Sequence, residues 1–336
     1  MNWGGSNLKL AALHTAQPEP GGFYVSGDIV QPLVSGKQST SEVSLSRVTI
    51  LPGTGQMLHR HAQHETLFVL EGQVRLTSVR GRTFRNFAAG PGALLHVPGC
   101  VPHMYFNDSS EPAVLLTFST PAGLEGFYAR AGQKVADVES ANCLSYDVDH
   151  IEGVGWQFGI EPIDPELFDS REGYRASGAH FCAPEAGQRY DLLGSLLRIV
   201  VDGSQSESWL TVLERTQGAG AQSPLIRHAG SGTYFVLEGS FEFVAYGDNG
   251  PQRLTAKAGS AVYRPAGMLH AFYNNAATSS RLLSFLTPAG IENFIRTVAR
   301  EVAPGEPDGH GDVTPDELER VSALGTQFGV EIKPEG

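Results

Sequence analysis

The chain of 336 residues has no long uncharged apolar segment. A membrane-spanning helix needs about 18 or more such residues, so none is expected. The segment from Met1 to Lys9 also lacks the basic stretch and following apolar stretch of a secretory signal peptide. These absences predict a cytoplasmic protein without a membrane partner.

Cysteines and clustered basic residues are equally scarce. Cys100, Cys143 and Cys182 are widely spaced and form no CxxC pair, which is typical of a reducing compartment and predicts no disulfide framework. Lys and Arg number 24 against 36 Asp and Glu, which gives a formal net charge of −12. Nucleic acids and anionic membranes favour clustered Lys and Arg, so neither is an expected partner.

Glycine and proline are abundant instead, with 40 and 20 residues. Because long apolar-periodic stretches are few, this composition favours many short strands joined by tight turns. The length suits two domains, and a hydrophobic content of 41% allows each domain a sizeable core.

An internal repeat relates the two halves of the chain, with an offset of 167 residues that holds without a gap from Gly36 to Phe127 and becomes 170 at Gln157. The matched positions include Gly53 and Gly220, Gly72 and Gly239, Pro98 and Pro265, and His103 and His270. This tandem duplication predicts two domains, at residues 1–165 and 166–336, linked through 144–180.

Short apolar runs and glycine turns in both halves indicate β-strands. Expected strands include 67–70, 74–77, 93–97, 113–118, 234–237, 241–244 and 282–285. Helices are expected at about 122–131 and 289–302, and the capping box Thr314-Pro-Asp-Glu317 predicts a third through about Ala323. The predicted fold class is all-β, with one eight-stranded antiparallel barrel or jelly roll in each half, followed by short helices.

Four candidate metal ligands lie in the first half: His59, His61, Glu65 and His103. Side chains at alternate strand positions face one side, so the first three point inward together if their strand is continuous, whereas His64 faces outward. Imidazoles with one carboxylate suit a divalent transition metal (Fe, Mn, Co, Ni, Cu or Zn) and leave coordination positions open to a substrate. The alternative is that these are ordinary polar residues on an exposed strand face. That interpretation would be the better one for a lone histidine, but four candidate ligands between glycines favour a metal site.

The second copy has lost half of this set. Ile226 and Gly232 stand where the first copy has a histidine and the glutamate, whereas His228 and His270 remain. Two imidazoles without a carboxylate make a poor site, so we expect one metal ion per chain. A weak accessory site in the second half is the alternative.

These residues resemble the motifs of the cupin superfamily. The first motif matches at Gly53, His59, His61, Glu65 and Gly72, and the second at Gly92, Pro98, His103 and Asn107, with Cys100 in place of the usual glycine. Together with the repeat, the match resembles a bicupin. The resemblance implies two small jelly-roll barrels with the metal inside the first.

The cupin fold serves many reactions and does not select one. A bicupin of this length resembles the flavonol dioxygenases (quercetin 2,3-dioxygenases), which implies that O₂ cleaves the heterocycle of an aromatic enol and that carbon monoxide and a depside are released. Glu65 is then the candidate catalytic base for the enolic proton. Met57, Phe68 and Tyr105 are candidate substrate-lining residues, although each is also typical of plain core.

Other functions stay open. Oxalate decarboxylases are also bicupins, but they normally keep ligands in both halves and need basic residues near a dianion, whereas Arg60 and Arg227 are expected to face outward. A non-oxygenase bicupin would use its metal for cyclisation or isomerisation. A non-catalytic binding cupin is disfavoured because no DNA-binding helix or basic segment accompanies the barrels. The expected partners are a small aromatic substrate and O₂, and the oligomeric state, a homodimer included, is open.

Overall fold

The structure, a computed structural model, describes residues 13–17, 21–81, 83–141, 144–165, 178–247, 250–303 and 313–333. The first half contributes β1 (His14–Ala16), β2 (Gly22–Val25), β3 (Asp28–Val34), β4 (Ser44–Ile50), β5 (Gly55–Arg60), β6 (His64–Glu71), β7 (Val74–Arg80), β8 (Thr83–Ala89), β9 (Leu94–Val97), β10 (His103–Phe106), β11 (Ala113–Thr120), β12 (Gln133–Val135) and β13 (Glu161–Pro162), with helices α1 (Leu124–Ala131), α2 (Val138–Ala141) and α3 (Val148–Gln157). The second half contributes β14 (His180–Cys182), β15 (Gln188–Leu192), β16 (Ser195–Val201), β17 (Thr211–Gln217), β18 (Leu225–Arg227), β19 (Ser231–Glu238), β20 (Ser240–Gly247), β21 (Gly250–Lys257), β22 (Ala261–Arg264), β23 (Leu269–Asn274), β24 (Ser280–Thr287), β25 (Arg300–Val302) and β26 (Glu331–Lys333), with α4 (Ile291–Val298), α5 (Pro315–Gly325) and the 3-10 helix η1 (Thr326–Phe328).

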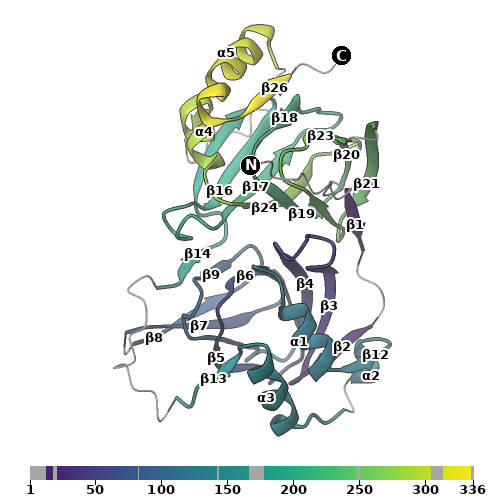
Figure 1. Cartoon of the computed structure of the whole chain (residues 1–336), viewed down its shortest axis with the longest axis vertical. Helices are drawn as coiled ribbons and strands as arrows, with labels where there is room; N and C mark the ends of the chain where they lie inside the picture. Colours follow the sequence, from purple (N-terminus) through teal and green to yellow (C-terminus); the bar gives the residue numbers. More distant parts are fainter. Residues whose placement is uncertain are drawn as a thin grey trace, which may run out of the picture.

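Each half folds as a jelly-roll barrel, which confirms the expected fold class (Figure 1). The first barrel combines an eight-stranded sheet, β12-β2-β3-β4-β11-β6-β9-β14, with a five-stranded sheet, β13-β5-β10-β7-β8. The second barrel repeats this plan with β1-β22-β19-β24-β17-β16-β15-β25 and β21-β20-β23-β18-β26. All of the strand pairs in the described residues are antiparallel, as short strands joined by tight turns predict.

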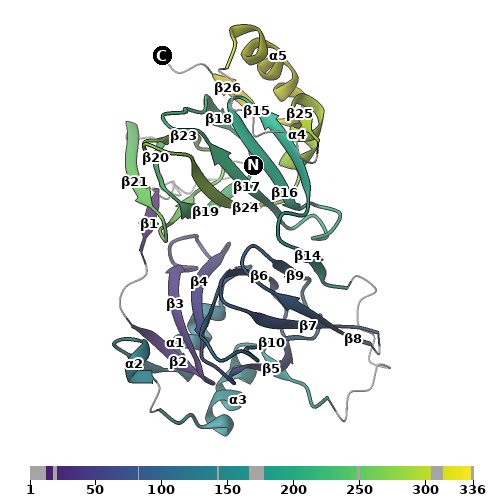
Figure 2. The ribbon, with the colours of Figure 1, turned by 180° about the vertical axis from the view of Figure 1, so that it is seen from behind.

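The two halves exchange edge strands. The N-terminal strand β1 pairs with β22 of the second barrel, and β14, which follows the expected domain boundary, pairs with β9 of the first barrel. Figure 2 shows β1 against the second barrel and β14 beside the first. Each eight-stranded sheet therefore contains one strand from the other half, and a cut after residue 165 would remove an edge strand from both barrels.

The two eight-stranded sheets also pack against each other through their outward faces. Phe118 and its repeat counterpart Phe285 stack with ring centroids 4.6 Å apart. Nearby, Trp209 of the second barrel packs on His64 of the first, with centroids 4.9 Å apart. The face of β6 that turns away from its own barrel is thus covered by the other barrel, so His64 does point outward but is buried.

The expected helices form with shifted ends. The first is α1, the second is α4, which ends at Val298 before β25, and the third is α5, which extends to Gly325. The capping box is confirmed because Thr314 Oγ1 accepts a hydrogen bond from the backbone N–H of Glu317 at 3.2 Å. Among the described residues, every helix is too short or too polar to cross a membrane.

The cysteines of the described residues, Cys100 and Cys182, are both free thiols. Cys143 lies outside the described residues.

Candidate metal centre

The four predicted ligands come together inside the first barrel. His59 lies at the end of β5 and His103 opens β10, and the two residues are directly opposite each other in the antiparallel pair of these strands. Glu65 reaches the group from β6 in the facing sheet. His61 lies between β5 and β6, because the chain turns after Arg60. The single continuous strand assumed for the first three ligands is therefore wrong, although all four side chains still converge.

The distances within this group suit one shared ion. One candidate ligand atom from each of the four residues lies within 4.8 Å of all the others, and all four residues are buried. Glu65 Oε2 lies 2.9 Å from His103 Nε2 and 3.4 Å from His61 Nε2. The histidine rings of His59 and His103 have centroids 4.4 Å apart. Such a compact buried set of three imidazoles and one carboxylate fits a divalent transition metal.

The backbone fixes which imidazole nitrogen faces the group. Nδ1 of His59 lies 2.8 Å from the carbonyl of Met57, and Nδ1 of His103 lies 2.8 Å from the carbonyl of Val101. A carbonyl oxygen only accepts, so each Nδ1 carries a proton and donates it, and Nε2 is the nitrogen that faces the group and can coordinate a cation once it carries no proton. Both ring nitrogens of His61 are buried and make no hydrogen bond among the described residues, and Nε2 lies only in the longer 3.4 Å contact with Glu65 Oε2. A bound ion would supply that missing partner, so the donor set fits a metal.

Burial and mutual contacts set the charges of the group. Burial, together with the neighbouring imidazoles of His103 and His61, lowers the pKa of His59 to about 3. Burial by itself would raise the pKa of Glu65, but the contacts with His103 and His61 outweigh it and hold this pKa below its ordinary value. At neutral pH the group therefore offers a neutral His59 imidazole and an ionised carboxylate, the forms that coordinate a cation.

A tight turn holds the loop that carries His61. The backbone N–H of Cys100 donates to the carbonyl of His61 at 2.7 Å, and Cys100 adopts a left-handed backbone with φ of 66°. The repeat counterpart Gly267 has φ of 72°, which explains why the motif favours glycine here. Gly99 is required because the backbone of Ala62 lies close to it: a Cβ at this position would lie 2.3 Å from the carbonyl oxygen of Ala62.

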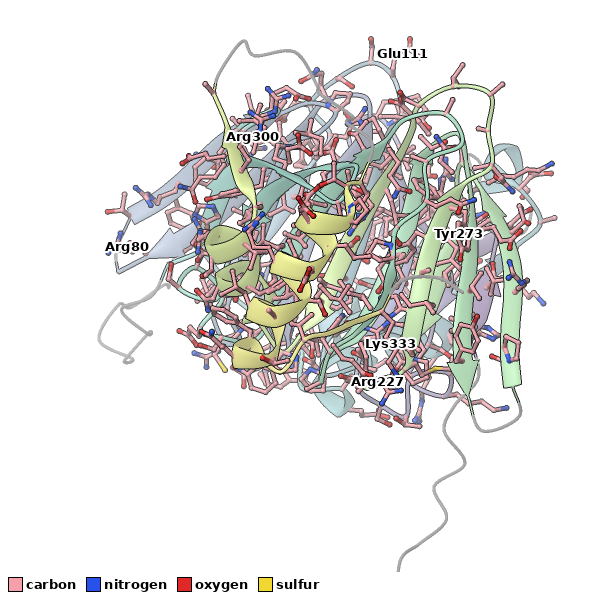
Figure 3. The ribbon with its side chains drawn as sticks, turned by 90° about the horizontal axis from the view of Figure 1, so that it is seen from above. Arg80, Glu111, Arg227, Tyr273, Arg300 and Lys333 are labelled. Carbon is pink, nitrogen blue, oxygen red and sulfur yellow. The ribbon has the colours of Figure 1, made fainter. Side chains whose placement is uncertain are left out.

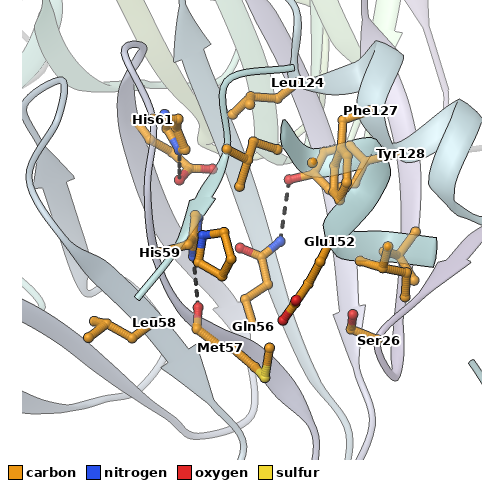
Figure 4. A pocket seen from close by; sticks show the side chains of 16 residues that line it. Ser26, Gln56, Met57, Leu58, His59, His61, Leu124, Phe127, Tyr128 and Glu152 are labelled. Atoms are coloured by element: carbon orange, nitrogen blue, oxygen red, sulfur yellow. Dashed lines mark hydrogen bonds and ion pairs between the residues drawn. The ribbon is translucent and has the colours of Figure 1, made fainter. Parts of the chain in front are cut away.

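A pocket opens onto the candidate metal group between the barrel and two helices (Figure 4). It encloses about 650 Å³ of space, part of it open to solvent. Its lining consists of Val25, Ser26, Gln56, Met57, Leu58, His59, His61, Glu65, Leu124, Phe127, Tyr128, Ile151, Glu152, Gly155, Ile160 and Pro162. The wall is mostly apolar, and these described lining residues include no Arg or Lys.

Of the three expected substrate-lining residues, the structure places Met57 in this pocket, where 56% of the residue is exposed. Phe68 packs instead in the core between the two barrels. It has the same strand parity as His64, so it turns away from the cavity. Tyr105 is buried in the barrel core, where its hydroxyl donates to Asp28 at 2.7 Å. Neither aromatic residue is part of the pocket wall.

Helix α3 is the part of the site that the sequence did not predict. It lies in the segment expected to be a linker, packs against α1 and supplies Ile151, Glu152 and Gly155 to the pocket. The signal was Asp147, a residue typical of helix N-caps, whose side chain accepts a hydrogen bond from the backbone N–H of His150.

In the second barrel an arginine side chain lies at the position that corresponds to the candidate metal group of the first barrel. Ile226 faces His270 as His59 faces His103, but Arg264 replaces Val97 of the first copy. Arg264 is fully buried, and its Nη2 donates to His228 Nε2 at 3.0 Å and to the carbonyl of Gly230 at 2.9 Å. The lone pair with which His228 Nε2 would bind a metal is therefore used by a guanidinium.

The absence of a carboxylate at Gly232, the counterpart of Glu65, is linked to the presence of Arg264. Gly232 pairs with Arg264 across β19 and β22, as Glu65 pairs with Val97 across β6 and β9. A Cβ at Gly232 would lie 2.3 Å from the hydroxyl of Tyr234, and that hydroxyl accepts a hydrogen bond from Arg264 Nε at 3.2 Å. The space of the lost glutamate is thus filled.

Comparison with known proteins finds a match to one domain family in each half of the chain. Residues 46–119 and 213–286 each match the cupin domain family. No curated protein matches the chain. Among solved structures, the chain is similar to a variant of Bacillus subtilis oxalate decarboxylase, with 16% identity, a TM-score of 0.59, and coverage of 90% of this chain and 81% of that chain. It is also similar to procruciferin, an 11S globulin from Brassica napus, with 14% identity, a TM-score of 0.57, and coverage of 84% and 85%.

A third similar structure is vicilin from Corylus avellana, with 17% identity, a TM-score of 0.55, and coverage of 82% of this chain and 85% of that chain. At such identities the likeness concerns the fold, which an oxalate decarboxylase, procruciferin and vicilin share. The bicupin architecture is confirmed, and the resemblance to flavonol dioxygenases stays a prediction.

Proposed function

Because the chain carries two tandem cupin domains, we propose that it is a metal-dependent dioxygenase that cleaves the heterocycle of a flavonol-like aromatic enol. The observation that carries this proposal is the pocket at the candidate metal group. Its wall is mostly apolar and includes Leu124, Phe127 and Tyr128, which suits a flat aromatic substrate. An oxalate dianion would favour a permanently cationic side chain, and the described pocket wall includes no Arg or Lys.

The residues of the first barrel have separate roles in this proposal. His59, His61, Glu65 and His103 hold one divalent ion, which when bound supplies a Lewis acid and a path for electrons to O₂. Glu65 also accepts the proton of the enolic hydroxyl, since it adjoins the pocket and its carboxylate is ionised at neutral pH. Helices α1 and α3 cover the substrate and exclude water. For quercetin, consumption of one O₂ yields one depside and one carbon monoxide, which balances the reaction.

An assay with and without oxygen tests the reaction. The metal-loaded protein is expected to consume one O₂ and release one carbon monoxide per quercetin, and to stop when O₂ is removed. Oxygen uptake and headspace carbon monoxide are the measurements. Equal turnover without O₂ would replace the proposal with a metal-assisted isomerase or cyclase. Binding of quercetin and metal without turnover would indicate a binding protein.

Metal content tests the assignment of the site to the first barrel. Elemental analysis of protein purified without added metal should give one ion per chain. The His61→Ala variant should lose this ion, because it removes one of the three candidate imidazole ligands. The His228→Ala variant, altered at the repeat counterpart, should keep it. Two ions per chain, or loss of the ion in His228→Ala, would contradict the assignment.

A further inference from the structure

The second barrel contains a cavity of its own, at the position equivalent to the pocket of the first. It encloses about 510 Å³ of space, part of it open, between Leu, Ile and Phe side chains and a few polar groups. The polar groups include Arg215, His228 and His270, and the described lining residues include no Asp or Glu. The cavity therefore has an apolar body and a cationic side.

Arg215 is the charged group that reaches this cavity. It replaces Val48 of the first copy, so its cation is a feature of the second barrel alone. Its Nη1 donates to Ser195 Oγ at 2.7 Å, and its guanidinium carbon lies 5.3 Å from the centre of the Phe272 ring. Neither neighbour carries a negative charge.

The nearest acidic residue in the sequence does not neutralise Arg215. Glu214 has the opposite strand parity, and its carboxylate accepts hydrogen bonds from Arg198 and Arg281. Burial lowers the pKa of Arg215 to about 10, which leaves it cationic at neutral pH in an environment that disfavours an uncompensated charge.

The buried Arg264 adds a second positive charge behind the cavity. Its hydrogen bonds go to the hydroxyl of Tyr234, to His228 and to two carbonyls, all uncharged groups. Arg264 is thus fixed in place, whereas Arg215 is partly accessible and has one hydrogen-bond acceptor among the described residues. Buried charges in proteins are usually paired, so two cations beside an open cavity indicate an absent anion.

We propose that the cavity of the second barrel binds a small organic carboxylate with an apolar body, through an ion pair with Arg215. The planar guanidinium matches a carboxylate through paired hydrogen bonds. Phe272 and the Leu and Ile side chains of the wall contact the apolar body. The duplicated barrel thereby exchanges a cation site for an anion site, and this function does not depend on the reaction proposed for the first barrel.

Titration with benzoate, followed by calorimetry, tests this site. Benzoate is expected to bind once per chain, and its uncharged analogue benzamide about 10- to 100-fold more weakly, as for a lost hydrogen bond to a charged group. The Arg215→Met variant should lose benzoate affinity by a similar factor. Arg215→Lys keeps the positive charge but loses the planar guanidinium that can donate two parallel hydrogen bonds, so this variant should bind benzoate with intermediate affinity.

Two control variants separate this site from others. Arg227→Met removes an exposed arginine at the edge of the same barrel, near Lys333 (Figure 3), and should bind benzoate as the unaltered protein does. His61→Ala should also keep benzoate binding, which excludes a carboxylate bound to the ion of the first barrel. No benzoate binding up to about 10 mM, or equal binding in Arg215→Met, would overturn the proposal. Loss of binding in His61→Ala would also overturn it.

Discussion

In the Glu65→Gln variant, turnover of quercetin should fall by about 10²- to 10⁴-fold while the barrel stays folded, because a general base is removed. Gln has nearly the same shape as Glu but cannot accept the enolic proton. It also removes the negative charge that faces His103 at 2.9 Å and His61 at 3.4 Å. The initial rate of oxygen uptake, measured at saturating quercetin, gives the effect on kcat.

Glu152→Gln is the matched control for this experiment. Glu152 is the other carboxylate of the pocket wall, but it comes from α3 and is not part of the histidine group. The same substitution there should change kcat little. Metal analysis of both variants separates loss of the ion from loss of the base. Unchanged turnover in metal-loaded Glu65→Gln would remove Glu65 from the reaction, and an equal loss in Glu152→Gln would show that any charge change in the pocket suffices.

The candidate ligands could be predicted from the sequence because their spacing is local and the repeat supplies an internal comparison. His59, His61 and Glu65 lie within seven residues, and the second motif identifies His103. The path of the chain between these ligands was harder to predict from the sequence. A turn after β5 places His61 correctly without the continuous strand that parity assumed. The same parity rule, applied to Phe68, would have assigned that ring to the face of His64.

Features that depend on contacts distant in the sequence could not be predicted. The loss of Glu65 in the second copy was visible as Gly232, but its compensation by Arg264 emerges only from the pairing of β19 with β22. The exchange of β1 and β14 between the barrels has the same origin. Short edge strands carry a weak local signal, and the partner that each strand finds is a matter of tertiary structure.

Asp28 should make the protein less stable as the pH rises from about 4 to about 8. Burial raises the pKa of Asp28 to about 8, against a partial opposing effect of the hydrogen bond from Tyr105. The folded protein therefore keeps a proton that the unfolded chain releases near its ordinary pKa. The stability due to Asp28 is complete below about pH 4 and is lost as the pH rises through 8. A shift of about four pKa units corresponds to at most about 5 kcal/mol.

The Asp28→Asn variant should lose this dependence, because Asn does not ionise and still offers an oxygen to the Tyr105 hydroxyl. The ionisable neighbours that influence or sense Asp28 are Tyr24, Tyr105 and Tyr128, none of which supplies a positive charge. In urea unfolding, the free energy of unfolding of Asp28→Asn relative to that of the unaltered protein should therefore be higher at pH 9 than at pH 5. Asp149→Asn, at an exposed position in the first turn of α3, should leave the difference between the two pH values unchanged. A difference that persists in Asp28→Asn would assign the pH dependence to another group.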